Sequence, residues 1–221
     1  MRRFTTVLLD VDGTIVNTIE LAIDTLGEAL RQLTGNRPSD AELRTVMHLP
    51  TAEAVRRFTS EPESVRLAAT WSASFEARLS EAFLYPGVRE GLETLRAAGF
   101  RLSVVTAQTR AELVRTFSVF DLSDFFHATV TADEVRRPKP APDSLLQALS
   151  LLGATPEEAV YLGDSPSDVA AARRCGIESA AALWGGQPQT ALMAARPDHA
   201  FPDFTAFVSW LLPRAANLFM T

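Results

Sequence analysis

Residues 7–14, Val7-Leu8-Leu9-Asp10-Val11-Asp12-Gly13-Thr14, join a short apolar run to two aspartates and a glycine. The apolar run predicts a buried strand, and the aspartates come where that strand would end. Because Asp10 and Asp12 are two residues apart in a nearly extended chain, their carboxylates can point to the same side. Carboxylates held side by side repel each other unless a cation or a shared proton compensates. In a doubly wound sheet, ligands bind outside the carboxyl ends of the strands, so this stretch predicts a functional site.

Further apolar runs, rich in Val and Leu, alternate with amphipathic segments of helical spacing along the rest of the chain. This alternation predicts right-handed crossovers and a parallel sheet covered on both faces. We therefore expect the α/β class, with a doubly wound, mostly parallel sheet forming a Rossmann-like core. The runs cover residues 102–105, 128–130, 160–162 and 180–183.

The alternation stops between about Asn17 and Phe83, where no convincing strand is present and apolar residues repeat at helical intervals. Residues 84–87, Leu-Tyr-Pro-Gly, then form a turn-like stretch before the next helix. We expect two domains, an α/β core of residues 1–16 and 84–221 and an inserted all-α domain of residues 17–83. Inserts at this point often act as lids over a site at the strand ends.

The composition is that of an ordinary globular protein of 221 residues, with 47% hydrophobic and 22% charged residues. The 27 acidic and 21 basic residues give a formal net charge of −6, which disfavours a nucleic-acid partner. No signal peptide or membrane span fits the start of the chain, since a span needs about 20 consecutive apolar residues. Cys175 is the single cysteine, which excludes an internal disulfide. We expect a cytoplasmic protein with no membrane partner.

Three further features strengthen the interpretation of the first aspartates. Thr106 follows an inner strand and offers a hydroxyl suited to a phosphate oxygen, followed by exposed backbone amides. Lys139 lies between prolines, which hold its backbone stiffly. Residues 163–168, Gly-Asp-Ser-Pro-Ser-Asp, follow another strand and bring Asp164 and Asp168 onto neighbouring surfaces of a helix start. Each feature alone also fits a helix cap or a solvated side chain.

The order Asp-x-Asp-x-Thr, then Thr, Lys and Gly-Asp-x-x-x-Asp resembles the haloacid dehalogenase superfamily of phosphohydrolases over essentially the whole chain. It most resembles the subgroup that contains phosphoglycolate phosphatases, related pyrophosphatases and β-phosphoglucomutases, and residues 17–83 look like its helical cap. The resemblance implies a Mg²⁺-dependent phosphatase that hydrolyses a small phosphorylated metabolite, phosphoglycolate-like, a sugar phosphate or related, through an aspartyl-phosphate intermediate.

The resemblance also implies roles for the charged residues. Asp10 is the expected nucleophile, and Asp12 the general acid and then the general base. Asp10, Asp164 and the backbone carbonyl of Asp12 match the ligands of Mg²⁺. Lys139 and the metal would offset the charges of Asp10 and the phosphate. Asp168 would orient Lys139 or a metal-bound water.

Two expected substrate contacts depart from the usual family pattern. Thr106 and the amides near Ala107 are expected to position the phosphoryl group, but Ala107 stands where relatives often carry Asn. Ala107 keeps the backbone contact and offers no amide side chain to the leaving group. His48 lies in a segment that resembles the substrate loop, where Gly is common. It would either contact a polar substrate or lie half-buried between cap helices, and both interpretations stay open.

Three other functions fit these motifs less well than a phosphatase. A β-phosphoglucomutase-like mutase usually has a basic cap residue where this chain has Pro50 and Thr51. A dehalogenase usually lacks the acid that Asp12 supplies. An inactive binding or regulatory member of the fold would be expected to lose some of the charged site residues, all of which are present. We expect a monomer or a weak homodimer, the latter through Leu218 and Phe219.

Overall fold

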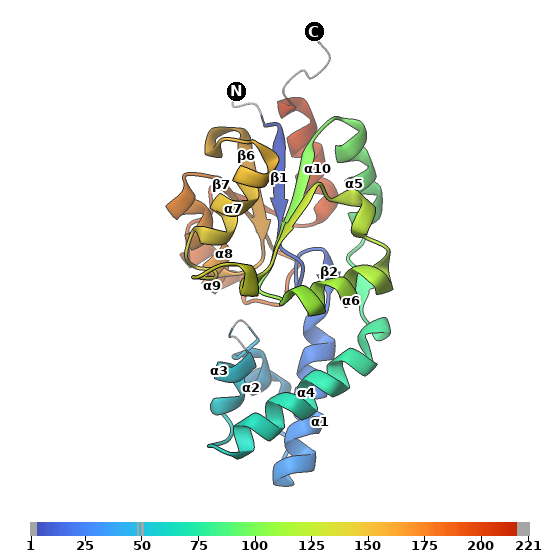
Figure 1. The fold of residues 1–221 in the computed structure, drawn as a ribbon, viewed down its shortest axis with the longest axis vertical. Coiled ribbons are helices and arrows are strands. Elements are labelled where there is room, and N and C mark those ends of the chain that lie inside the picture. The colour runs from blue at the N-terminus through green and yellow to red at the C-terminus, as the bar shows by residue number, and fades with distance from the viewer. Residues whose placement is uncertain (1–3, 48, 50, 216–221) are drawn as a thin grey trace. The chain divides into compact units, whose positions relative to one another are not determined.

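A six-stranded parallel sheet, in the order β5-β4-β1-β6-β7-β8, lies at the centre of the larger part of the molecule (Figure 1). The computed structural model describes residues 4–47, 49 and 51–215. The strand order changes direction at β1, which places the carboxyl end of β1 at the switch point where ligands bind in such sheets. The strands are β1 (Thr6–Leu9), β4 (Arg101–Val105), β5 (Ala128–Val130), β6 (Ala159–Gly163), β7 (Glu178–Ala182) and β8 (His199–Phe201).

Strand β1 pairs with β4 on one side and with β6 on the other, so that Leu9 stands opposite both Val104 and Leu162. Val7, Leu8 and Leu9 are fully buried, as expected for a strand covered on both faces. The predicted fold class, a doubly wound parallel sheet, is confirmed. Strand β8 was not predicted, because its three residues form no apolar run.

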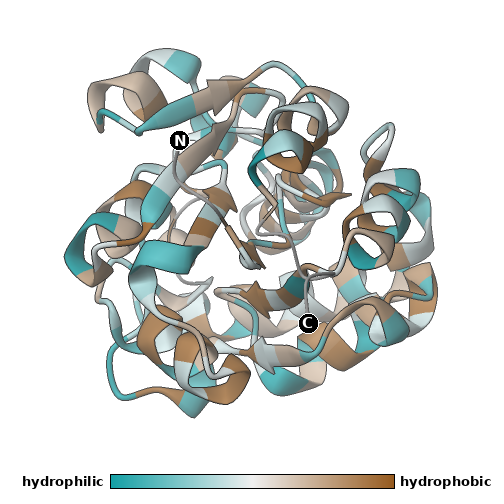
Figure 2. Ribbon diagram, turned by 90° about the horizontal axis from the view of Figure 1, so that it is seen from above, coloured by the Kyte–Doolittle hydropathy of each residue, from teal (hydrophilic) through white to brown (hydrophobic). Residues whose placement is uncertain are grey.

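Helices cover the two faces of this sheet (Figure 1). On one face, α7 and α8 pack against Leu8 of β1 and Tyr161 of β6. On the other, α5 and α10 pack so closely that a Cβ added at Gly91 would lie 2.5 Å from the ring of Phe204. Figure 2 shows helices that carry both hydrophobic and hydrophilic residues, as amphipathic covering helices do. These helices are α5 (Val88–Ala97), α6 (Arg110–Phe120), α7 (Asp143–Leu152), α8 (Pro166–Cys175), α9 (Gln189–Ala194) and α10 (Phe204–Leu211).

The chain divides into two compact units. The α/β unit comprises Met1–Val16 and Leu84–Thr221, and the helical unit comprises Asn17–Phe83. Strands β2 (Val16–Asn17) and β3 (Phe83–Leu84) pair where the chain passes between the units. The expected lack of strands in the insert is therefore wrong at its two ends, because strands of two residues are too short to leave a periodic pattern. Short 3-10 turns are η1 (Leu79–Glu81), η2 (Ser123–Phe125), η3 (Ala132–Glu134), η4 (Pro156–Glu158) and η5 (Leu212–Arg214).

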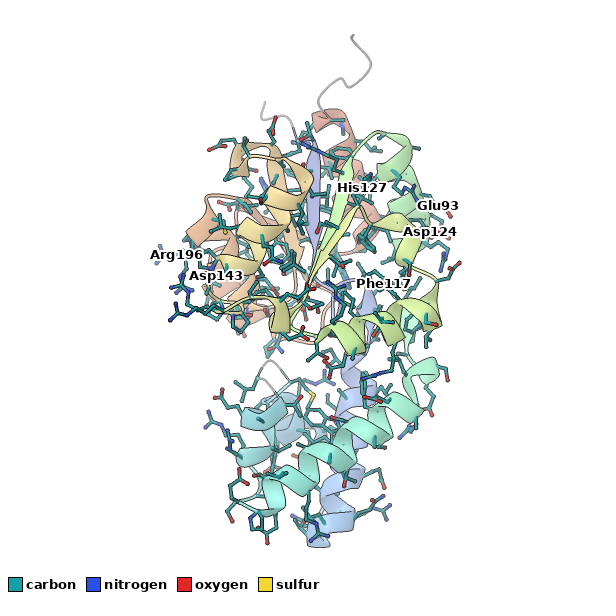
Figure 3. The ribbon with its side chains drawn as sticks, in the orientation of Figure 1. Glu93, Phe117, Asp124, His127, Asp143 and Arg196 are labelled. Atoms are coloured by element: carbon teal, nitrogen blue, oxygen red, sulfur yellow. The ribbon has the colours of Figure 1, made fainter. Side chains whose placement is uncertain are left out.

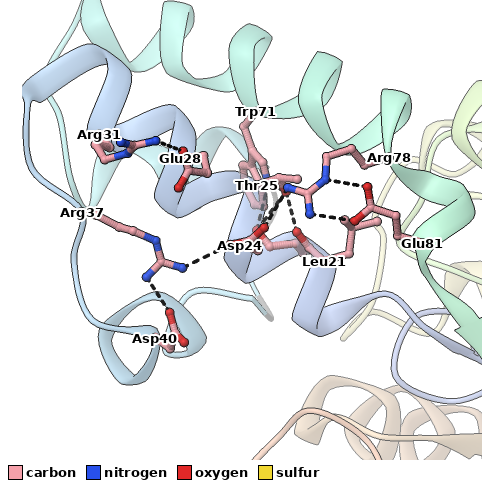
Figure 4. Close-up of polar contacts among 11 residues, drawn as sticks. Leu21, Asp24, Thr25, Glu28, Arg31, Arg37, Asp40, Trp71, Arg78 and Glu81 are labelled. Carbon is pink, nitrogen blue, oxygen red and sulfur yellow. Dashed lines mark hydrogen bonds and ion pairs between the residues drawn. The ribbon is translucent and has the colours of Figure 1, made fainter.

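The helical unit has its own apolar core and its own polar contacts. Residues Ile23, Leu26, Leu43 and Leu67 are buried together in the core. The indole N–H of Trp71 donates to the carbonyl of Ala22, which ties α4 to α1 (Figure 4). Its helices are α1 (Ile19–Thr34), α2 (Asp40–Arg44), α3 (Thr51–Arg56) and α4 (Glu63–Ala77).

Some residues named from the sequence cannot be placed. His48 and Pro50 lie outside the described residues, and so do Leu218 and Phe219. Within the described part of the chain, no helix has both the length and the apolar character that crossing a membrane requires.

Candidate active site

Three of the predicted site residues directly follow three neighbouring strands of the sheet. Asp10 follows β1, Thr106 follows β4 and Asp164 follows β6. The backbone N–H of Asp10 donates to the carbonyl of Leu162 (2.9 Å), and that of Thr106 to Val130 (3.1 Å), so the ladder fixes both backbones. Because the strands are parallel and adjacent, their carboxyl ends meet at one edge of the sheet and bring these side chains together.

Lys139 reaches this edge from the loop before α7. Its Nζ lies 3.0 Å from Asp10 Oδ2 and 2.7 Å from Asp168 Oδ1, and only 5% of its side chain is exposed. It also donates to the hydroxyl of Tyr161 (2.9 Å). Burial acts to lower the pKa of Lys139, but the charges of Asp10 and Asp168 outweigh burial and raise it above its usual value. The lysine is therefore a buried, permanently charged neighbour of Asp10.

The loop that carries Lys139 is closed at its ends. Arg137 forms an ion pair with Asp143, at the start of α7, with an N–O distance of 2.8 Å (Figure 3 labels Asp143). Within the loop, the N–H of Ala141 donates to the carbonyl of Pro138 (3.0 Å). These contacts and the prolines hold the lysine backbone while its side chain reaches inward.

Asp168 is occupied by hydrogen bonds on both of its oxygens. Ser165, the N-cap of α8, donates to Oδ2 from its hydroxyl (2.5 Å) and its backbone N–H (3.0 Å). The Nζ of Lys139 and the hydroxyl of Tyr161 both lie within hydrogen-bond distance of Oδ1. Although burial acts to raise the pKa of Asp168, the ion pair with Lys139 and these hydrogen bonds lower it. Asp168 is thus an ionised carboxylate that orients Lys139.

Asp164 is buried against two glycines. A Cβ added at Gly13, whose φ is +76°, would lie 2.2 Å from Asp164 Oδ2, and one added at Gly185 would lie 2.3 Å from Asp164 Cβ. Burial and the charges of Asp168 and Asp10 raise the pKa of Asp164 well above its usual value. The N-cap of α8 is Ser165, so Asp164 does not serve as the cap that its position alone would also have allowed.

The donor set fits a divalent cation. Asp10, Asp164 and Asp168 each offer a carboxylate oxygen, and these oxygens all lie within 4.8 Å of one another. Burial raises the pKa of Asp10 to about 7 against the opposing charge of Lys139. Buried carboxylates at this spacing repel each other unless positive charge is added, and oxygen ligands are those that Mg²⁺ prefers. The cluster contains Asp10 and Asp164 of the predicted ligands.

The side chain of Asp12, predicted to bind metal through its backbone, contacts a residue that the sequence did not single out for the site. Gln108 Nε2 lies 3.0 Å from Asp12 Oδ1 and 2.9 Å from Oδ2. The backbone N–H of Gln108 donates to the hydroxyl of Thr106 (3.1 Å), which leaves the Thr106 O–H able to donate to a ligand. Ala107, between them, is exposed.

Tyr161 is the second residue that sequence reasoning missed. It was expected only as part of a buried strand, and it is 1% exposed. Its single O–H proton has two acceptors within reach, Asp168 Oδ1 (2.9 Å) and the carbonyl of Val105 (3.0 Å). A tyrosine within an apolar strand is a usable signal, because a buried phenol needs a polar partner.

Comparison with known proteins places the chain in a family. A model described as haloacid dehalogenase-like hydrolase matches residues 7–182. Pyrophosphatase PpaX of Bacillus cereus strain G9842 is 31% identical over 219 residues, covering 98% of each chain. Pyrophosphatase PpaX of Bacillus velezensis is 29% identical over 198 residues, covering 90% of this chain and 92% of that protein.

Solved structures show the same fold. A predicted phosphoglycolate phosphatase from Haemophilus somnus superposes with a TM-score of 0.88 at 22% identity, covering 95% of this chain and 99% of that one. A HAD-superfamily hydrolase of subfamily IA from Geobacter sulfurreducens gives a TM-score of 0.74 at 22% identity, covering 94% and 96%. The chain belongs to the haloacid dehalogenase-like hydrolase family. The prediction of an enzyme, a hydrolase, is confirmed by this membership.

Proposed function

We propose that this chain is a Mg²⁺-dependent phosphatase that hydrolyses a small phosphorylated metabolite through an aspartyl-phosphate intermediate. The observation that carries the proposal is the buried carboxylate of Asp10, held 3.0 Å from Lys139 Nζ at the carboxyl end of the central strand. In this proposal the α/β unit performs the chemistry, and the helical unit, residues 17–83, is the cap that selects the substrate. The cytoplasmic location stays a prediction.

Asp10 is the nucleophile in the proposed reaction. Its Oδ1 accepts from the N–H of Val11 (2.8 Å) and its Oδ2 pairs with Lys139, so the carboxylate is held at both oxygens. One carboxylate oxygen forms a bond to phosphorus while the bond from phosphorus to the leaving oxygen breaks. The leaving oxygen keeps the electron pair and takes a proton from Asp12. Asp12 then accepts a proton from the water that attacks the aspartyl-phosphate, releasing inorganic phosphate and restoring Asp10.

Asp10, Asp164 and the backbone carbonyl of Asp12 would hold Mg²⁺, which supplies positive charge against the phosphate and the carboxylates when bound. Asp168 lies in the same cluster, but its oxygens already accept from Lys139, Tyr161 and Ser165, so it acts through the lysine. Lys139 places a fixed positive charge beside the phosphoryl oxygens as charge develops there. The hydroxyl of Thr106 and the amide of Ala107 donate to the same oxygens.

A phosphate-release screen tests the function. Purified protein is assayed with and without Mg²⁺ on phosphoglycolate, sugar phosphates, nucleotides and pyrophosphate. Pyrophosphate belongs in the panel because relatives about as long as this chain are named pyrophosphatases. We expect Mg²⁺-stimulated release of inorganic phosphate from at least one compound. Release in step with substrate loss separates hydrolysis from the mutase alternative. A complete lack of release across the panel would contradict the proposal and favour a binding role.

A further inference from the structure

We infer that Gln108 is a positioning residue, which holds the Asp12 carboxylate in the orientation that delivers its proton to the leaving group. This inference rests on the proposed phosphatase function. Its basis is the pair of contacts from Gln108 Nε2 to Asp12 Oδ1 (3.0 Å) and Oδ2 (2.9 Å). A donor shared between the two oxygens of one carboxylate restrains the direction in which the whole group points.

The amide is carried by a fixed backbone. Gln108 donates its own N–H to the Thr106 hydroxyl (3.1 Å), and its carbonyl accepts from the N–H of Ala132 (2.9 Å). Helix α6 begins two residues later, after the capping residue Thr109. Asp12 and Gln108 therefore lie shortly after the ends of β1 and β4, which are adjacent strands, and the Gln108 backbone is held by hydrogen bonds at both its N–H and its carbonyl.

Packing alone does not explain a glutamine here. The residue is only 8% exposed, and its Oε1 finds no hydrogen-bond partner among the described residues. A buried acceptor without a partner is unfavourable, and methionine or leucine would fill a similar volume without it. The structure therefore tolerates a cost at one atom of the amide, while the other atom contacts the proposed proton donor. Such uncompensated groups call for a functional explanation.

The consequence for the reaction concerns the first step. As the Asp10 oxygen bonds to phosphorus, the bond from phosphorus to the leaving oxygen breaks and the leaving oxygen keeps the electron pair. The more basic the leaving oxygen is, the more it needs the proton from Asp12. An alkoxide is a poor leaving group and needs the proton, whereas p-nitrophenolate leaves without it. Loss of Gln108 should therefore affect alkyl phosphates selectively. The quantity to measure is kcat/KM, because it reports the step that releases the leaving group and is insensitive to later hydrolysis of the aspartyl-phosphate.

The test compares Gln108→Met with wild type on an alkyl phosphate from the active panel and on p-nitrophenyl phosphate. We expect kcat/KM to fall about 10- to 100-fold for the alkyl phosphate, part of the roughly 10²–10⁴ that acid–base catalysis supplies, and less than about 3-fold for the aryl phosphate. Gln147→Met, the same chemical change on α7, is the matched control and should change neither. Gln108→Asn keeps an amide but shortens the side chain, and gives a second measurement if Gln108→Met does not fold.

A double-mutant cycle separates positioning from a structural role. If Gln108 acts through Asp12, adding Gln108→Met to Asp12→Asn causes no further loss of kcat/KM on the alkyl phosphate. Equal losses on both substrates, or an additive loss in the double variant, would overturn the inference and leave the phosphatase proposal intact. A wild-type protein that releases no phosphate from any compound would overturn both.

Discussion

In both the α/β unit and the helical unit a charged side chain bridges two side chains of opposite charge, and the two bridging side chains differ in burial. In the α/β unit, Lys139 bridges Asp10 and Asp168, with 5% of the lysine side chain exposed. In the helical unit, Asp24 bridges Arg78 (2.7 Å) and Arg37 (3.5 Å), with 46% of the aspartate side chain exposed (Figure 4). Both clusters join carboxylates to cations, but two carboxylates share one cation in the α/β unit and two guanidinium groups share one carboxylate in the helical unit.

The two clusters differ in what they do to the pKa of the carboxylic acid. Hydrogen bonding from Arg78 lowers the pKa of Asp24, as in an ordinary surface ion pair. Burial raises the pKa of Asp10 to about 7, even with Lys139 beside it. Water screens the exposed cluster around Asp24. Its ion pair with Arg78 joins the start of the inserted helical unit to its end. The buried cluster around Lys139 keeps the energetic cost of its charges, and added positive charge, such as a bound cation, can relieve that cost.

The largest expected effect follows from removing the nucleophile. Asp10→Asn should lower kcat by more than about 10⁴-fold, in the range that loss of a catalytic nucleophile costs. The midpoint of thermal unfolding should not fall, because the substitution removes a buried carboxylate whose ionised form burial disfavours. Phosphate release and thermal melting measure the two effects. Substantial activity in a preparation free of wild-type protein and of deamidation would show that Asp10 is not the nucleophile.

Lys139→Met should break the buried cluster and cost about 3–5 kcal/mol of the free energy of unfolding, because Asp10 and Asp168 lose their shared cation. Activity should also fall steeply. Arg78→Met in the helical unit is the matched control, since it removes the cation of the exposed cluster and should cost much less. Urea unfolding measures both variants. Equal losses in the two variants would mean that burial is not what separates the clusters.

Sequence reasoning recovered what is local or periodic. The apolar runs at 7–9, 102–105, 128–130 and 160–162 are strands, and Asp10 and Asp164, which follow the ends of two of them, lie together at one edge of the sheet. What it missed depends on pairing across the fold. Gln108 and its partner Asp12 are 96 residues apart in the sequence, and Tyr161 and Lys139 are 22 residues apart. Nothing in the neighbourhood of either residue encodes its partner.

The pH dependence of stability should differ between the clusters. In metal-free protein with a chelator, the folded chain holds the Asp10 proton up to about pH 7, whereas the unfolded chain releases it near its usual value of 3.8. The folded state therefore binds more protons in this range, so the free energy of unfolding should decrease as pH rises from about 4 to 7. The raised pKa of Asp164 acts in the same direction.

Urea unfolding over a pH series measures this slope. Asp10→Asn is the control and should make the slope shallower, because the variant has no proton to lose at that position and only Asp164 still contributes in this direction. Asp168 acts in the opposite direction because its pKa is lower in the folded chain than in the unfolded chain. Its contribution to stability is present at pH values above the pKa of the unfolded chain and is lost as the pH falls. A slope that is unchanged in Asp10→Asn would assign the titration to other groups.

The smallest expected effect is that of Asp24→Asn, which removes the carboxylate of the exposed cluster. Arg78 and Arg37 then return to water, and the free energy of unfolding should fall by less than about 1 kcal/mol. The Debye screening length falls to about 3 Å at 1 M salt. The difference in the free energy of unfolding between Asp24→Asn and wild type should therefore shrink as NaCl is raised from 0.05 M to 1 M. Because folding lowers the pKa of Asp24, its contribution to the free energy of unfolding is present at pH values above the pKa of the unfolded chain. That contribution is lost as the pH falls, which is opposite in sign to the contribution of Asp10. Lys139→Met, by contrast, should keep its cost at high salt, because ions do not reach a side chain that is 5% exposed. A salt-insensitive loss in Asp24→Asn would show that the two clusters are equally shielded from solvent, and the contrast between them would then need another cause.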